Sequence, residues 1–251
     1  GTAIGENVLV SNTTGEANTG VGAEVLISNS TGYWNTSAGV NSMFSNTTGY
    51  KNAAFGFQSL VSNTEGYQNT AAGTFSGYGL KTGGNNVAIG YQSMASNDSG
   101  SNNVAVGVNS LYSHRRPGSS YNTAVGNYSL EQDTSGLLNT AIGVSAIRSN
   151  INSVGNTATG CNAMYNHKYN DYNTAVGYES MVTDSAGSLN TAMGWRSLRY
   201  NKMGSENTAL GVGALEFTDS SYRNTVVGRG AMIGTFNATT DLAYNTVVGF
   251  Y

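Results

Sequence analysis

The chain has 251 residues, a formal net charge of −3 and only 10% charged residues. The lack of a basic block argues against a nucleic-acid-binding protein, and no apolar run reaches the ~18 residues that a membrane-spanning helix needs. The only cysteine, Cys161, excludes a disulfide framework within one chain. We therefore expect no binding of nucleic acid and no membrane insertion. Because the sequence starts and stops inside a repeat, we also expect a piece of a longer protein.

One unit of 17 residues recurs along the whole chain. Its clearest part is the motif N-T-A-x-G, whose glycines lie 17 residues apart, except for 19 between Gly107 and Gly126 and 21 between Gly228 and Gly249. Seventeen residues are too few for a helix pair or a propeller blade, but they suit two short strands and two turns. We predict an all-β fold, a parallel β-solenoid (β-roll) of about 15 coils that forms a single domain over residues 1–251.

Residues one period apart should stack in columns, and we number the positions of the repeat from the motif asparagine, as in residues 52–68. Positions four and nine are apolar in most coils, as at Phe55 and Leu60, which predicts that these two columns face each other in a thin core. Positions three and eight are small, as at Ala54 and Ser59. Small residues would let two backbone layers, or a second subunit, approach closely. The glycine at position five recurs in every coil, as a corner with positive φ requires.

The motif asparagine recurs from Asn18 to Asn245 without a gap. Two interpretations stay open at this stage. The side chains could form a ladder of hydrogen bonds from coil to coil, or each could serve its own turn, either in a left-handed backbone conformation or through an Asx-turn. Both interpretations give the asparagine a structural role.

A lone coil has few large apolar side chains to bury, whereas ordering all of its residues costs conformational entropy. A single chain is therefore only marginally stable by this comparison. The small and apolar columns could supply an interface with further copies. We accordingly expect the chain to associate with itself.

In chain order, the first variable feature is a column of three tyrosines, Tyr33, Tyr50 and Tyr67, beside Trp34. An exposed aromatic stripe could stack on the sugar rings of a cell-surface polysaccharide. The alternative is that these rings pack against the next coil or a neighbouring subunit.

The two longer coils follow later in the chain. One adds two residues around His114, Arg115, Arg116 and Pro117, and the other adds four around residues 235–241. Insertions in solenoids map to surface loops, often on a binding face, although a tolerated bulge is the alternative. The candidate receptor-binding residues are therefore Tyr33, Trp34, Tyr50, Tyr67, His114, Arg115 and Arg116.

Catalytic residues are not evident in the repeat. The only histidines, His114 and His167, lie three coils apart in the count of repeats, too far for one metal site at ~4.8 Å per coil. No carboxylate recurs at a core-facing position, so an acid–base pair has no support. Turn carboxylates such as Asp98 and Asp219 are expected to be solvated, with a weak calcium site as the alternative. We expect no enzyme, no cofactor and no metal centre.

The motifs N-T-A-V-G, N-V-A-I-G and N-T-A-I-G resemble the head repeats of trimeric autotransporter adhesins. The stretch over residues 45–60 looks even more like repeats of phage tail-fibre proteins. This resemblance covers essentially the whole chain and implies a homotrimer of parallel β-rolls. The adhesin repeat is shorter, so the additional residues should enlarge a turn, and the handedness of the winding stays open.

The resemblance implies a structural and adhesive segment of a virion tail fibre, a rigid spacer that can bind a cell-surface polysaccharide or an outer-membrane receptor. The alternatives are an adhesin of the bacterial cell surface or a self-assembling extracellular filament. The threonines at position two, which run from Thr2 to Thr246 with breaks at Ala53, Val87 and Val104, leave an ice-binding solenoid as a minor alternative. A polysaccharide-degrading β-helix is disfavoured, because it would need clustered carboxylates.

Overall fold

The computed structural model describes residues 1–183, 187–234 and 242–250. It divides into two compact units, Gly1–Asn127 and Tyr128–Tyr251. Regular structure in these described ranges consists of short β-strands, and none of it is a helix that could cross a membrane. In the first unit the repeat strands are β1 (Thr2–Ile4), β2 (Thr19–Val21), β3 (Thr36–Ala38), β4 (Ala53–Phe55), β5 (Thr70–Ala72), β6 (Val87–Ile89), β8 (Val104–Val106) and β10 (Thr123–Val125).

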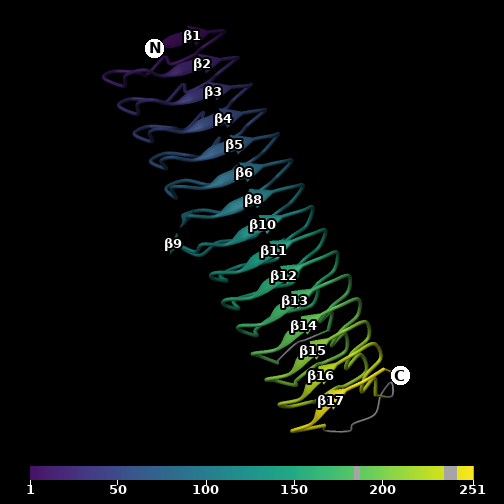
Figure 1. Cartoon of the computed structure of the whole chain (residues 1–251). Helices are drawn as coiled ribbons and strands as arrows, with labels where there is room; N and C mark the ends of the chain where they lie inside the picture. Colours follow the sequence, from purple (N-terminus) through teal and green to yellow (C-terminus); the bar gives the residue numbers. More distant parts are fainter. Residues whose placement is uncertain (184–186, 235–241, 251) are drawn as a thin grey trace. The chain divides into compact units, whose positions relative to one another are not determined.

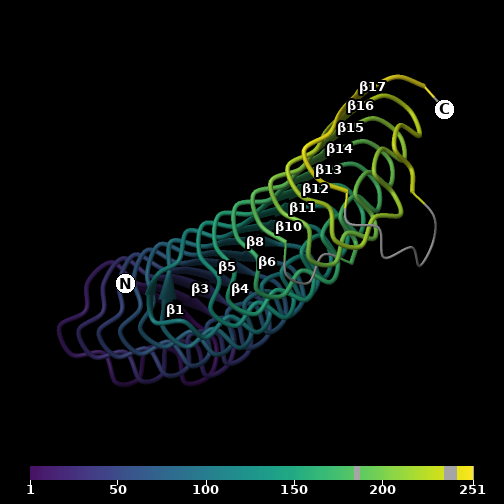
Figure 2. The same ribbon diagram turned by 90° about the horizontal axis from the view of Figure 1, so that it is seen from below.

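The second unit continues the same pattern. Its strands are β11 (Thr140–Ile142), β12 (Thr157–Thr159), β13 (Thr174–Val176), β14 (Thr191–Met193), β15 (Thr208–Leu210), β16 (Thr225–Val227) and β17 (Thr246–Val248). Within each unit, successive strands lie side by side (Figure 1), and Figure 2 shows the coils one behind another.

Neighbouring strands in each unit pair in parallel, with every residue opposite its equivalent in the next coil. Thr70 pairs with Val87 in the first unit, and Thr140 pairs with Thr157 in the second. Even the longer coil keeps this alignment, because Val104 pairs with Thr123. The predicted all-β parallel β-solenoid with a 17-residue period is confirmed. The expectation of two strands in every coil is wrong. In the described residues a coil has one strand of three residues, and only two coils add another, β7 (Gly100–Ser101) and β9 (Gly118–Ser119).

The interior of the coil is built from positions three, eight and nine. Ala54, Ser59 and Leu60 are all fully buried. Positions three and eight touch directly, since the Ser37 hydroxyl lies 2.7 Å from the Ser42 hydroxyl. The large side chains of the core are almost all from position nine, namely Leu26, Met43, Leu60, Met94, Leu111, Leu130, Ile147, Met164, Met181, Leu198 and Leu215.

The prediction that position four also faces the core is wrong. Ile89, Ile142 and Met193 stand at this position and are 40%, 43% and 46% exposed. Alternate residues of a strand point to opposite faces. Because the alanine at position three points inward, the large residue at position four must point outward. The small residue at position three lets the two backbone layers of the coil lie close together, as the sequence predicts.

The motif asparagines form a buried ladder in both units. In the first unit the Asn69 side-chain amide donates to the Gly83 carbonyl oxygen at 2.8 Å, and its oxygen accepts from the Asn86 backbone N–H at 3.0 Å. In the second unit the Asn173 oxygen accepts from the backbone N–H of Asn190 at 2.8 Å. Each asparagine thus ties its own coil to the next coil.

The ladder interpretation is therefore confirmed, with backbone groups as the main partners. A left-handed conformation at the asparagine itself is wrong. The residue with positive φ is the one before it, such as Gln68 with φ of 54°.

A second ladder, absent from the sequence-based expectations, runs through position twelve. The Asn29 amide donates to the Asn12 side-chain oxygen at 2.7 Å. The Asn46 amide likewise donates to the Asn29 side-chain oxygen at 2.7 Å. In the second unit the Asn150 amide donates to the Asp133 carboxylate at 2.9 Å. In these coils the second turn is thus also joined to the next coil by polar side chains, whereas Leu80 interrupts the column.

The glycine at position five makes the corner that its recurrence predicted. Gly56 has φ of 132°, and a Cβ there would lie 2.7 Å from the Gly73 carbonyl oxygen. Positions seven and nine also have positive φ, although most are not glycine, as at Gln58 (52°) and Leu60 (49°). Such backbone is unfavourable for large residues. It is held by bonds between coils, including Leu60 N–H to the Ser76 carbonyl at 3.0 Å.

Substitution of the core methionine Met94 by alanine should destabilise the fold by about 2–5 kcal/mol, because a fully buried side chain is replaced by a cavity. Urea unfolding followed by circular dichroism measures this change. Met94→Leu is the matched control, since leucine occupies the same column at Leu60 and Leu111, and it should cost less than about 1.5 kcal/mol. Equal costs for the two variants would contradict the assignment of position nine to the core.

Substitution of Asn69 by alanine should cost about 1–3 kcal/mol for each buried group that loses its partner. The groups concerned are the Gly83 carbonyl and the Asn86 N–H. Thr70→Ala, one residue along, is the control, because Thr70 is exposed and Ala53 stands in the same column. Urea unfolding should show a large loss for the first variant and a change near zero for the second. A similar loss in both would refute the ladder.

Candidate functional site

The outer face of the strands is the most extensive surface feature that the repeat creates. Positions two and four project from it, and neither column contains a single charged residue. The strongly exposed large residues of position four are Ile4, Val21, Phe55, Ile89, Ile142, Met193 and Val248. Threonine and alanine fill much of the remaining face. Uncharged faces with exposed apolar side chains are typical of the central part of protein interfaces.

Position six extends this apolar surface around the glycine corner. Its strongly exposed members are Val40, Phe57, Tyr91, Val144, Tyr178, Trp195, Val212 and Phe250. Together with the exposed residues of position four they form what we call the apolar stripe. Each unit carries its own part of the stripe along successive coils.

The predicted tyrosine column forms a stack. The ring centroids of Tyr33 and Tyr50 lie 4.9 Å apart with planes inclined by 8°, and those of Tyr50 and Tyr67 lie 5.4 Å apart with planes inclined by 10°. The backbone of Gly84 covers the end of the stack, since a Cβ there would lie 2.5 Å from the Tyr67 ring. The rings thus pack against neighbouring coils, as the alternative interpretation predicted. Much of their flat surface faces another ring.

Trp34 is the accessible member of this group. Trp34 is 56% exposed, its ring meets Tyr33 edge-on at 5.2 Å, and the Lys51 ammonium lies 5.0 Å from the ring centroid. Tyr33 and Trp34 also line a shallow hollow of about 270 Å³ with Thr14, Glu16 and Thr31. The structure therefore brings these two residues together at one place, whereas Tyr50 and Tyr67 serve the stack.

The first insertion carries exposed arginines but not an exposed histidine. Arg115 and Arg116 are exposed, whereas His114 is fully buried with its Nε2 2.8 Å from the Ser120 hydroxyl. The expectation that His114 lies on the surface loop is wrong. It stands at position twelve, in the column of the second ladder, where it anchors the loop. Just beyond the arginines, β9 (Gly118–Ser119) pairs in parallel with β7 (Gly100–Ser101). The second insertion, around residues 235–241, lies outside the described residues.

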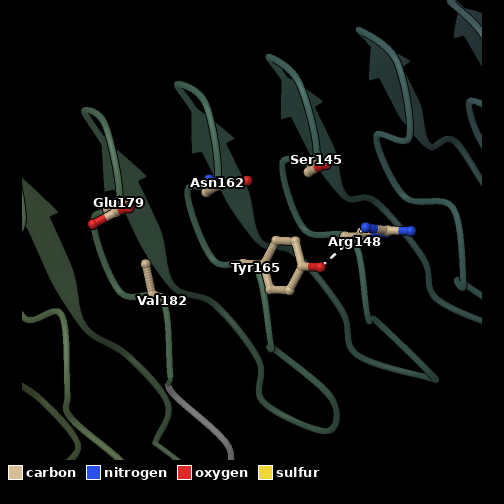
Figure 3. A pocket seen from close by; sticks show the side chains of 6 residues that line it. All are labelled: Ser145, Arg148, Asn162, Tyr165, Glu179 and Val182. Carbon is tan, nitrogen blue, oxygen red and sulfur yellow. Dashed lines mark hydrogen bonds between the residues drawn. The ribbon is translucent and has the colours of Figure 1, made fainter.

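A charged pocket of about 330 Å³ escaped the sequence analysis. It is formed by positions seven and ten of successive coils in the second unit, and Figure 3 shows its six lining side chains. The Arg148 guanidinium donates to the Tyr165 hydroxyl at 3.0 Å. It also donates to the Glu131 carboxylate at 2.6 Å. The sequence does contain a signal for these contacts, because Glu131, Arg148 and Tyr165 are spaced by 17 residues and therefore stack in one column.

Ion pairs hold the carboxylate of this pocket ionised. Glu179 lies 3.0 Å from Arg196 Nε and 2.7 Å from Arg199. Burial alone would raise the pKa of the Glu179 carboxyl, but hydrogen bonds from Tyr178 and Arg196 and the nearby charge of Arg199 outweigh it and lower the pKa. Burial raises the pKa of Glu216, which lies 3.8 Å from Arg199. These charges neutralise one another between coils, which suits a structural role.

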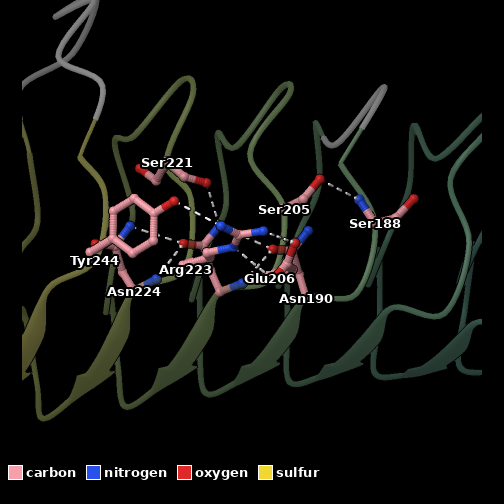
Figure 4. A network of polar contacts seen from close by, with 9 residues as sticks. Ser188, Asn190, Ser205, Glu206, Ser221, Arg223, Asn224 and Tyr244 are labelled. Carbon is pink, nitrogen blue, oxygen red and sulfur yellow. Dashed lines mark hydrogen bonds and ion pairs between the residues drawn. The ribbon is translucent and has the colours of Figure 1, made fainter.

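A third polar group lies on the turn that precedes the motif asparagine. Figure 4 shows Arg223 between Glu206, at 2.9 Å, and the Tyr244 hydroxyl, at 2.7 Å. The hydrogen bond from Arg223 lowers the pKa of the Glu206 carboxyl. Below them runs the ladder from Asn190 to Asn224. This group also joins coils one period apart.

His167 occupies position twelve and takes the place of a ladder asparagine. It is fully buried, its Nε2 donates to the Asn170 carbonyl oxygen at 3.0 Å, and burial lowers its pKa to about 4. The two histidines therefore have structural positions in their units. Over the described ranges, no cluster of three or more histidine, cysteine or acidic side chains has the arrangement of a metal site.

Comparison with known proteins adds no assignment, because no protein family, no curated protein and no solved structure matches this chain. The resemblance of the repeat to fibre and adhesin repeats therefore enters only as support for a proposal.

Between pH 6.5 and about 4, folding stability should fall as the pH falls. The unfolded chain binds a proton at His167 in this window, whereas the folded chain keeps the ring neutral, so protonation favours unfolding by up to roughly 3 kcal/mol at the lower end. Urea unfolding at several pH values measures the effect. His167→Asn restores the residue found at Asn150 and Asn201, and it should remove this part of the pH dependence. An unchanged pH profile in the variant would refute the prediction.

Proposed function

We propose that this chain is a structural and adhesive segment of a homotrimeric extracellular fibre, such as a phage tail fibre, and that its copies associate through the apolar stripe. The observation that carries the proposal is the uncharged outer face of the strands. Soluble monomers rarely expose large contiguous apolar patches. Here the pattern places exposed apolar side chains in coil after coil of both units.

A further copy of this chain is the partner that fits such a face best. The face has no charge to repel its own copy, and it repeats with the same spacing in every coil. Three identical faces could therefore contact one another coil by coil. Burial of apolar side chains contributes ~25 cal/mol per Å², which would add to the thin interior of each coil.

The stacking of the coils supports the proposed role of a spacer. Each coil adds ~4.8 Å to the length of its unit, and the buried ladder of motif asparagines ties it to its neighbours. Adhesion would come from shallow surface contacts multiplied over several chains, which raises the apparent affinity through avidity. Trp34, Arg115 and Arg116 are the exposed members of the predicted receptor-binding set. The proposed location is a virion tail fibre or a bacterial cell surface.

Aspartate substitutions on the stripe should weaken the oligomer. Ile142→Asp combined with Met193→Asp places two charges on the outer face of the strands. Light scattering coupled to size-exclusion chromatography should then give a smaller mass than the trimer expected for the wild type.

The matched control is Leu138→Asp combined with Leu189→Asp. These leucines are 57% and 56% exposed but lie on the turn before the motif asparagine, and their positive φ suits aspartate. The control pair should keep the wild-type mass. A folded wild-type monomer, or equal loss of mass in both pairs, would refute the proposed interface. Open filaments in electron micrographs of the wild type would favour a self-assembling filament instead.

A further inference from the structure

The coil over residues 69–85 departs from the repeat at positions nine, eleven and twelve. Gly77 replaces the large core residue of position nine, and Leu80 replaces the polar residue of position twelve and is fully buried. A Cβ at Gly77 would lie 2.8 Å from the Leu60 side chain. The buried leucine has therefore moved three residues along this coil. Gly79, between them, has no side chain where Ser62 and Ser96 carry one in the adjacent coils.

The next coil adds a gap in an aromatic column. Position ten holds Tyr78, Ala95 and Tyr112 in three successive coils. Two coil spacings separate the backbones at Tyr78 and Tyr112 by ~9–10 Å, and a flat ring in contact on both faces would need ~7–8 Å. The alanine at Ala95 thus leaves open the space that a third ring of this column would fill, and we call this space the slot. A hollow of about 400 Å³ lies here, between positions seven and ten.

The aromatic side chains at this hollow are arranged differently from the tyrosine stack. Phe75 meets Tyr78 at 5.8 Å and 70°, and Tyr91 at 6.1 Å and 74°. These are edge contacts, whereas the stacked tyrosines cover one another face to face. Tyr78 is 42% exposed. The hollow therefore offers aromatic carbon surface to a ligand.

Polar groups complete the lining of the hollow. The Gln92 amide and the hydroxyls of Ser96, Tyr78 and Tyr112 make no hydrogen bond to other side chains or backbone within the described part of the chain. They provide donors as well as acceptors. None of the described residues that line the hollow is charged. The charged pocket of the second unit uses the same two positions of the repeat, so the difference in charge comes from the residues and not from the fold.

We propose that the hollow at Tyr78, Ala95 and Tyr112 binds one uncharged pyranose ring of a glycan. A pyranose has apolar C–H faces that pack on aromatic rings, and it has hydroxyls at its edge that both donate and accept hydrogen bonds. Its chair is thicker than a flat ring, and two coil spacings are wider than a flat ring needs. A quaternary ammonium ion would use the aromatic surface alone and would leave the Gln92 amide unused.

The inference rests on the adhesive part of the proposed function and not on the oligomer. Saturation-transfer NMR with the methyl glycosides of glucose, galactose and N-acetylglucosamine tests it, with choline as the competing probe. At least one glycoside should give a signal with the wild type. Ala95→Tyr fills the gap with the residue of the adjacent coils and should lower the affinity by about tenfold or more. Gln92→Leu should also weaken binding.

Ala95→Ser is the matched control, because a small residue leaves the slot open, and it should bind as the wild type does. Light scattering on Ala95→Tyr should show an unchanged oligomer, which separates failure of the glycan site from failure of the interface. Three results would overturn the proposal. They are no signal from any of the glycosides, a glycoside signal that Ala95→Tyr leaves intact, and a signal from choline alone.

Discussion

The buried asparagine that opens each coil is the interaction on which the rest of this structure depends. A coil of 17 residues has little interior of its own, so it must be held by its neighbours. Asn69 uses both ends of its side-chain amide for this, one on the Gly83 carbonyl and the other on the Asn86 N–H. A slip of one residue between coils would leave buried polar groups without partners, at a cost of about 1–3 kcal/mol each. The ladder therefore fixes the alignment of the coils as well as their cohesion.

Fixed alignment turns the sequence into columns, and the columns become surfaces. The Arg–Glu pairs at Arg148, Arg196 and Arg223 all reach a glutamate 17 residues earlier. The tyrosine stack has the same origin, as does the uncharged outer face of the strands. A single residue type repeated at one position is thus enough to make an extended feature. Because charged residues one period apart are brought together, a chain with only 10% charged residues can still form several ordered ion pairs between coils.

Local sites arise where one column changes while the alignment holds. His114 and His167 replace asparagines in the second ladder and remain buried. Leu80 enters the same column, and the Leu60 side chain occupies the space beside Gly77 where a Cβ would point. The longer coil keeps its pairing at Val104 and Thr123, so its additional residues are accommodated around Arg115 and Arg116. The backbone tolerates these changes because hydrogen bonds between coils do not depend on the side chain at every position.

The sequence by itself determined the period, the short strand of the motif, the glycine corner and the structural role of the motif asparagine, whereas the second strand that it suggested for each coil forms only at β7 and β9 in the described residues. Each of these follows from local chemistry repeated at one spacing. It could not decide which apolar column faces inward, because positions four and nine are equally apolar. Only the tertiary structure decided this. Ala54 and Leu60 are fully buried, and the alternation of the strand then turns Phe55 outward. The stacking of Tyr33, Tyr50 and Tyr67, the burial of His114 and the hollow beside Ala95 were decided in the same way. They depend on side chains that the folded coils bring together from different repeats.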